Sequence, residues 1–199
     1  MTEKNESCQS IQKIEVKQET HDHIQNVVKQ IVEVYETRTY DTLENPDDSI
    51  KAYFDWMLTK TKLNYGNVVD SVLSPPTTPS FPIIVSGIYW AYLGENIGSE
   101  QNKHRPILVI RSSKSSDLCI AIPLSTQHRN DDNWNHIDLV GYKHTALIEQ
   151  VLRLSKKRIT KPQRVKGRIA EADPKDMDTI YKQLAAYIGS TPSFIKTNL

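Results

Sequence analysis

Three short apolar segments constrain the fold of this chain more than any other feature. In the first, residues 88–93, Ile, Trp and Tyr alternate with Tyr, Ala and Leu, which is the period-two pattern of a β-strand. The second and third, residues 107–110 and 118–124, are short and rich in β-branched residues, as buried strands are. Polar loops separate the segments, so we expect a small, twisted, mostly antiparallel sheet with these loops at one end.

Residues 1–65 are predicted to be a helical extension that precedes the sheet. Apolar residues recur at helical spacing over positions 24–35, and Asn45 followed by Pro46 is typical of a helix start. About the first 20 residues are polar and charged, and we expect them to be mobile. Two short helices bury little by themselves, so we expect them to pack on each other and on the sheet domain, a second subunit or another protein.

The rest of the chain predicts a linker and one further domain. Residues 66–85 contain four of the ten prolines, a composition that predicts a semi-rigid linker. Residues 86–199 are then one domain, in which residues 146–154 predict another strand. Asp173 as N-cap and Pro174 at the first helical position predict a closing helix. The expected fold class is α+β.

The near-neutral net charge of +1 hides an uneven distribution. Residues 1–80 hold 8 Lys and Arg against 13 Asp and Glu, whereas residues 103–168 hold 14 against 5. Lys and Arg displace condensed counterions from phosphates, so the basic segment suits a polyanion such as a nucleic acid. A solvated surface that the acidic N-terminal part balances explains the charges equally well.

The two cysteines indicate neither a disulfide framework nor a metal site. Cys8 lies in a polar tail and Cys119 in an apolar run, and no metal-ligand spacing surrounds either. No apolar segment approaches the roughly 18 residues that span a bilayer, and the N-terminus has no signal-peptide core. We therefore expect a cytoplasmic protein that does not bind membranes.

Five sequence motifs follow one another from Gly87 onward. They are Gly87-Ile-Tyr-Trp90, Gly98-Ser-Glu-Gln101, Arg105-Pro-Ile-Leu-Val-Ile110, Ile122-Pro-Leu-Ser-Thr126 and the segment from Ala146 to Arg158. In this order they resemble the PemK/MazF family of toxin endoribonucleases. The resemblance implies an SH3-like, mostly antiparallel β-barrel with a C-terminal helix, here preceded by the N-terminal helical extension.

The resemblance also implies a function. It predicts a sequence-selective mRNA interferase that cleaves single-stranded RNA without a metal or other cofactor. In the family the ribose 2′-OH attacks the phosphate and leaves a 2′,3′-cyclic phosphate, and a cognate antitoxin blocks the RNA groove. We expect a homodimer, as in the family.

Two residues match the family's catalytic positions. Arg105 matches the catalytic arginine, which stabilises charge on the phosphoryl oxygens. Ser125 stands where the family usually has threonine, and it keeps the hydroxyl but loses the methyl group that stiffens χ1. In an antiparallel sheet the start of one strand neighbours the end of its partner, so both can face one phosphate. The alternatives are an arginine paired with Glu100 or with a carbonyl at the edge of the sheet, and a serine that caps a turn.

Eight further residues are predicted to bind the substrate. They are Ser99, Glu100, Gln101, Thr126, Gln127, Gln150, Arg153 and Arg158. For the loop that contains Ser99 a purely structural turn is an equal alternative, and for Gln150 an exposed strand position. Arg153 and Arg158 suit phosphates, although an arginine in this segment can equally serve a dimer contact.

Two other functions remain open on sequence alone. Relatives of this barrel bind DNA gyrase instead of cutting RNA, and a gyrase supercoiling assay would distinguish that activity. The replacement of threonine by Ser125 is also compatible with an RNA-binding module that has lost catalysis, which would bind RNA without releasing products.

Overall fold

The computed structural model divides the chain into two compact units, residues 1–76 and residues 77–199. The residues that it describes are 15–37, 46–69, 72–74, 78–97, 99–129 and 131–189. Most of the tail that we expect to be mobile, together with Cys8, lies outside these residues. Among the described residues, no helix combines the length and apolar character needed to cross a bilayer.

The N-terminal unit contains two helices and a small hairpin. Helix α1 spans Gln18–Thr37 and α2 spans Pro46–Tyr65, which confirms the helical extension. Strands β1 (Asn67–Val69) and β2 (Val72–Ser74) pair antiparallel. No residue of α1 is buried, and apolar residues of its predicted stripe such as Ile24 are exposed. What the helices pack against therefore stays a prediction.

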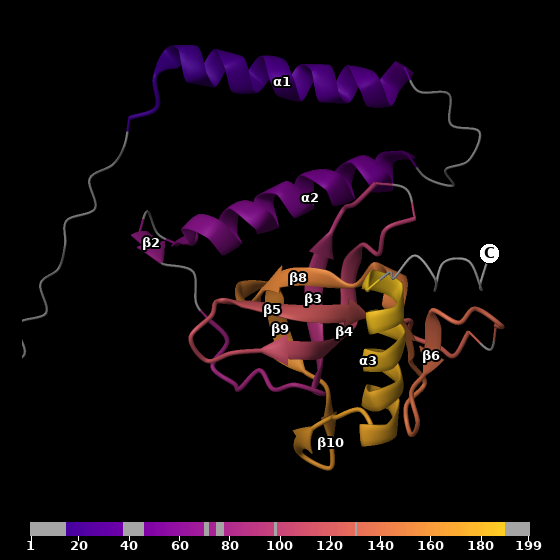
Figure 1. Ribbon diagram of the computed structural model, residues 1–199. Coiled ribbons are helices and arrows are strands. Elements are labelled where there is room, and N and C mark those ends of the chain that lie inside the picture. The colour runs from indigo at the N-terminus through magenta and orange to yellow at the C-terminus, as the bar shows by residue number, and fades with distance from the viewer. Residues whose placement is uncertain are drawn as a thin grey trace, which may run out of the picture. The chain divides into compact units, whose positions relative to one another are not determined.

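A five-stranded antiparallel sheet forms the centre of the second unit (Figure 1). Its strands are β3 (Ile88–Gly94), β4 (Lys103–Ser112), β5 (Leu118–Pro123), β8 (Leu152–Ser155) and β9 (Ile159–Pro162). They lie in the order β8-β5-β4-β3-β9. Strands β3, β4 and β5 are the ones that the three apolar segments predict. The α+β class and the mostly antiparallel sheet are confirmed.

The sheet is curled, because its two edge strands are consecutive in the chain. The short 3-10 helix η2 (Lys156–Arg158) is the only link between β8 and β9. Four chain steps reach at most about 14 Å, whereas the outer strands of a flat five-stranded sheet lie about 19 Å apart. The strands must therefore bend around toward one another, as they do in a small barrel.

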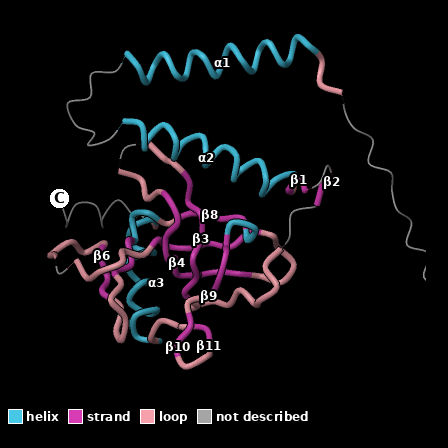
Figure 2. Tube along the Cα trace, turned by 180° about the vertical axis from the view of Figure 1, so that it is seen from behind, coloured by secondary structure: helices cyan, strands magenta, loops and turns pink. Residues whose placement is uncertain are grey.

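Each face of the curled sheet covers its own apolar cluster. Leu108 and Ile122 belong to the first cluster, to which α3 (Pro174–Ile188) contributes Ile180. Helix α3 lies beside the strands of the sheet (Figure 2). Asp173 caps this helix as predicted, because its carboxylate accepts a hydrogen bond from Lys175 N at 2.8 Å. The second cluster contains Ile107, Val109, Tyr89 and Ala121, among others. Successive residues of β4 thus face opposite clusters.

The C-terminal half contains shorter elements than the sequence predicts. Residues 146–154 do not form one strand: β7 (Thr145–Leu147) ends at a 3-10 helix, η1 (Ile148–Gln150), and β8 follows. Strand β7 pairs instead with β6 (His136–Asp138). The remaining strands, β10 (Arg164–Val165) and β11 (Arg168–Ile169), pair as a short hairpin.

The segment that precedes β3 is attached to the barrel core. Phe81 stacks on Tyr89 with ring centroids 6.1 Å apart, and Ile83 and Ile84 pack against the second cluster. The fully buried Tyr89 hydroxyl donates to Pro82 O and accepts from Ile84 N, both at 2.9 Å. Residues 81–84 therefore pack as part of this unit, while the predicted linker limits at 66–85 stay a prediction.

Candidate functional site

Arg105 lies near the N-terminal end of β4, where the central strand leaves the sheet for the loop 95–102. It pairs with Ala91 of β3, and its side chain is half-buried. The guanidinium Nε donates to Asn102 O at 2.8 Å. Since this bond uses the Nε–H alone, the two terminal amino groups of Arg105 remain able to bind an anion in a bidentate fashion.

Ser125 lies two residues beyond the end of β5. The last aligned pair of β4 and β5 is Ile107 with Pro123, and the Leu124 N donates to Pro106 O at 2.9 Å. Leu124 also forms a bridge with Ala146, and Ser125 N donates to Thr145 O at 2.8 Å. Neither Arg105 nor Ser125 is fully buried. The two residues predicted to be catalytic therefore lie at neighbouring ends of β4 and β5.

The hydroxyl of Ser125 takes part in a local turn. Its Oγ accepts a hydrogen bond from Gln127 N at 3.3 Å, which is the turn-capping role that the sequence leaves open. A hydroxyl that accepts one bond still has its own hydrogen to donate. Thr126 and Gln127 are exposed next to it, and Gln127 O accepts from Thr145 Oγ1 at 3.3 Å.

Gln150 and Gln101 lie in contact although 49 residues separate them. Gln101 N donates to Gln150 Oε1 at 3.3 Å, and Gln101 O accepts from Asn96 Nδ2 at 2.6 Å. The bond between Gln101 and Gln150 joins the loop before Arg105 to η1. Ser99 and Glu100 are exposed in the same loop. Structure therefore joins two of the predicted substrate-binding residues directly.

The two predicted phosphate-binding arginines of the basic segment have different positions. Arg158, in η2, is half-buried and donates through Nη2 to Leu93 O, at the end of β3 that neighbours Arg105. Burial lowers the pKa of the Arg158 guanidinium. Because it bonds a main-chain carbonyl, Arg158 has at least a structural role.

Arg153 lies at the other end of the sheet. It faces Ile120 of β5, which in turn faces Arg111 of β4. Arg111 is six residues from Arg105, which corresponds to about 20 Å along a strand. The structure therefore does not bring Arg153 to Arg105. Arg153 is close in sequence to Gln150, but β8 carries it away from Arg105. Its binding of substrate stays a prediction.

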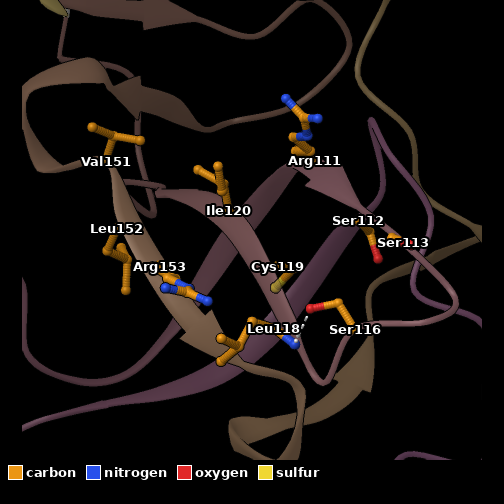
Figure 3. A pocket seen from close by; sticks show the side chains of 10 residues that line it. All are labelled: Arg111, Ser112, Ser113, Ser116, Leu118, Cys119, Ile120, Val151, Leu152 and Arg153. Atoms are coloured by element: carbon orange, nitrogen blue, oxygen red, sulfur yellow. Dashed lines mark hydrogen bonds between the residues drawn. The ribbon is translucent and has the colours of Figure 1, made fainter.

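Arg153 instead lines an open hollow of about 510 Å³ (Figure 3). Figure 3 shows Ile120 between Arg111 and Arg153 on three adjacent strands, and Ser112, Ser113 and Ser116 lie at the rim. Ile120 is 36% exposed, although it lies in the middle of a regular strand. This face combines an apolar centre with two arginines.

Sequence reasoning missed two groups near the site. His104 contacts the rings of Trp90 and Tyr92, with centroids 5.4 and 4.7 Å away, and burial together with Lys161 lowers the pKa of its imidazole. The other group contains His144, which is buried and lies 2.9 Å from Ser125 O through Nδ1. Strand alternation could have paired the aromatic side chains, whereas nothing in the sequence links His144 to Ser125.

No group of three or more His, Cys, Asp or Glu side chains that could hold a metal ion occurs in the part of the chain that the structure describes. Arg105 and Ser125 together offer a fixed cation and a hydroxyl at one position. That combination can bind a phosphate and stabilise charge that develops on its oxygens.

Comparison with solved structures gives related toxins as matches. MazF from Deinococcus radiodurans is 19% identical, covers 57% of this chain and 99% of its own, and has a TM-score of 0.44. The MazE–MazF complex from the same organism is 18% identical, covers 56% of this chain and 100% of its own, and has a TM-score of 0.43. Mycobacterium tuberculosis toxin MazF-mt6 is 9% identical, covers 53% of this chain and 98% of its own, and has a TM-score of 0.38. No curated protein sequence matches the chain.

One protein family matches at the level of sequence. Its profile, described as PemK-like, MazF-like toxin of type II toxin-antitoxin system, covers residues 86–188. This range includes the whole sheet, the candidate site and α3, and it is more than half of the chain. The chain therefore belongs to the family of PemK-like, MazF-like toxins of type II toxin–antitoxin systems.

Proposed function

We propose that this toxin-family chain is an endoribonuclease that cleaves single-stranded RNA, such as mRNA, at selected sequences and without a metal ion. The observation that supports this proposal most strongly is the register of β4 and β5, because Arg105 and Ser125 each lie two residues beyond its last pair, Ile107 with Pro123. Residues of this type have little to contribute to the core, and neither is fully buried. A phosphodiester held between them would meet a permanent cation and a hydrogen-bond donor.

In this mechanism the ribose 2′-oxygen attacks the phosphorus and the bond to the 5′-oxygen breaks. The products are a 2′,3′-cyclic phosphate and a 5′-hydroxyl, with one proton leaving the 2′-OH and one reaching the departing oxygen. The terminal amino groups of Arg105 stabilise charge on the phosphoryl oxygens. The Ser125 hydroxyl, held at its lone pair by Gln127 N, donates its hydrogen to one of them.

The loops around these residues would guide the RNA. We assign Ser99, Glu100, Gln101, Thr126, Gln127 and Gln150 to substrate binding, because they are at the same end of the sheet. Arg158 holds the end of β3 beside them. Arg153 lies apart from this group and lines the hollow of Figure 3. We assign it to a contact with a second copy of the chain at that hollow.

The test is to map RNA ends after incubation with the wild-type protein and two arginine variants. Arg105→Ala should lower the cleavage rate about 10²–10³-fold, the usual cost of losing one group that stabilises the transition state. Arg111→Ala is the matched control, because it removes the same charge from the same strand far from the site. Its cleavage rate should stay within about threefold of wild type, since it makes no transition-state contact.

The chemistry is checked in the same experiment. Cleavage should continue in excess EDTA, and the new 5′ ends should accept phosphate from polynucleotide kinase without prior dephosphorylation. Equal cleavage by wild type and Arg105→Ala would contradict the assignment, as would 5′-phosphate ends. RNA binding without products would instead identify a non-catalytic binding module, and inhibition of gyrase supercoiling would identify a gyrase-binding protein.

The protein is further proposed to act in the cytoplasm as a homodimer with a cognate antitoxin as partner. The hollow around Ile120 suits a contact with a second copy, because exposed apolar residues flanked by arginines are typical of protein interfaces. Ile120→Asp should convert a dimer to a monomer in analytical ultracentrifugation. Ile97→Asp, in a loop where the side chain is 90% exposed, is the control and should leave the mass unchanged. A monomeric wild type would contradict the dimer.

A further inference from the structure

A buried histidine contacts the main chain of Ser125. His144 precedes β7, and only 9% of its surface is exposed. Its Nδ1 lies 2.9 Å from Ser125 O. A carbonyl oxygen can only accept a hydrogen bond, so Nδ1 must hold the hydrogen and donate it. The imidazole thus donates a hydrogen bond to the main-chain carbonyl of Ser125, the residue whose hydroxyl acts in the proposed mechanism.

The ring of His144 is fixed from its other sides. Its Nε2 lies 3.1 Å from the end of the Gln163 side-chain amide, in the segment that joins β9 to β10. With the hydrogen on Nδ1, Nε2 can only accept, so the amide must present its NH2 group to the ring. Tyr142 lies nearly parallel to the imidazole, with centroids 6.4 Å apart, and its hydroxyl donates to Glu171 O at 3.0 Å. An imidazole held on three sides cannot turn without losing several contacts, so its Nδ1–H has a defined direction.

The residue after His144 holds the amide on the other side of Ser125. Ser125 N donates to Thr145 O at 2.8 Å. The Thr145 hydroxyl lies within bonding distance of Gln127 O, and it accepts from Arg129 N at 3.0 Å. Thr145 is fully buried and also contacts Asp138 Oδ1. Two consecutive residues therefore bind both peptide groups of Ser125 and the turn behind it.

We propose that His144 is a positioning residue for Ser125. By donating from Nδ1 to Ser125 O it fixes the peptide that follows the serine, and so directs the hydroxyl toward the phosphate beside Arg105. Without this bond the carbonyl is free to rotate, and the turn from Ser125 to Gln127 loses one of the three hydrogen bonds that attach it to His144 and Thr145. The inference rests on the proposed ribonuclease function, which it deepens.

Two substitutions separate the hydrogen bond from the ring. In His144→Asn the side-chain amide nitrogen occupies the place of Nδ1 and can still donate to Ser125 O. In His144→Gln the amide instead reaches the place of Nε2, near Gln163, and the bond to Ser125 O is lost. Both variants remove the imidazole and its stacking on Tyr142, so each is a control for the other.

The first measurement is single-turnover RNA cleavage together with RNA affinity. His144→Gln should lower the rate at saturating RNA about tenfold to a hundredfold, the range expected when a reacting group is displaced slightly. Its Kd should be unchanged, and His144→Asn should keep a rate near that of wild type. Equal rates in the two variants, whether normal or reduced, would overturn the proposal. If His144→Gln does not fold, His144→Ala takes its place, because it also removes the bond to Ser125 O. A rate equal to that of His144→Asn would then overturn the proposal as well.

The second measurement does not depend on activity. Hydrogen exchange of the Ser125 and Gln127 amides should be faster in His144→Gln than in His144→Asn, because only His144→Asn keeps the hydrogen bond to Ser125 O. Identical exchange in both variants would overturn the positioning role. A wild-type protein that does not cleave RNA would refute the ribonuclease function, while the exchange rates would still decide whether His144 holds the Ser125 segment.

Discussion

Gly87 is predicted to be required because Tyr89 occupies the space that a side chain would need. A Cβ at this position would lie 2.6 Å from Tyr89 Cε2 and 2.8 Å from its hydroxyl oxygen. Ordinary contacts between carbon atoms begin at roughly 3.5 Å. The ring would therefore have to move by the better part of an ångström, although it is fully buried and stacked on Phe81.

The expected cost of Gly87→Ala follows from these contacts. Moving the ring strains the two hydrogen bonds of the hydroxyl with Pro82 O and Ile84 N, each worth about 0.5–1.5 kcal/mol. Overpacking of this kind typically costs about 1–3 kcal/mol. We expect Gly87→Ala to lower the free energy of unfolding by an amount in that range. In a Tyr89→Leu background, where the obstructing atoms are gone, the same change should cost less than about 1 kcal/mol.

Urea denaturation of the four proteins in this cycle, followed by tryptophan fluorescence, measures the coupling. Gly167→Ala is the control, because Gly167 has a φ of +81° and nothing within 4 Å of the added Cβ. Its cost comes from backbone conformation and should be the same with tyrosine or leucine at position 89. If Gly87→Ala costs equally much in both backgrounds, a steric conflict with Tyr89 is not the reason for this glycine.

Three further outcomes are expected. Ser125→Ala should slow RNA cleavage about a hundredfold, whereas Ser125→Thr, which keeps the hydroxyl, should cleave at least as fast as wild type in the same assay. The pKa of His104 lies below its ordinary value of 6.5 because of burial and the neighbouring Lys161, so the folded protein binds fewer protons than the unfolded chain just below that pH. The free energy of unfolding should therefore decrease as the pH falls below about 6.5, and urea midpoints at pH 7 and pH 5 should differ less for His104→Gln than for wild type. Burial raises the pKa of the Cys119 thiol, so iodoacetamide should label it far more slowly in the native protein than in urea, as followed by mass spectrometry.

The central part of the fold could be predicted from local patterns. The alternation over residues 88–93 puts Tyr89, Ala91 and Leu93 in one buried cluster, whereas Trp90 and Tyr92 are half-buried against His104. The apolar segments that follow became β4 and β5. Because these strands are consecutive and antiparallel, their pairing also predicts that Arg105 and Ser125 are neighbours. The register is consistent with this up to Ile107 and Pro123, two residues short of the site. A role in catalysis stays a prediction.

The features that the sequence could not give depend on long-range contacts. Residues 146–154 are mostly apolar, so their pattern does not reveal that η1 interrupts them and that the pairing partner changes from β6 to β5. The same break separates Gln150, which contacts Gln101, from Arg153, which lies at the far end. The bond from His144 to Ser125 spans 19 residues and leaves no local signal.

The 3-10 helix η2, which joins the two edge strands of the sheet, has a consequence for how strongly RNA affinity depends on salt. Lys156 Nζ donates to Ser113 O and Ser116 O, both at 2.6 Å, and Arg158 donates to Leu93 O. These cations neutralise carbonyl dipoles of the protein itself rather than nucleotide phosphates. A count of basic side chains therefore overstates how many sodium or potassium ions RNA gives up on binding, and the affinity should tolerate salt better than the excess of lysine and arginine suggests.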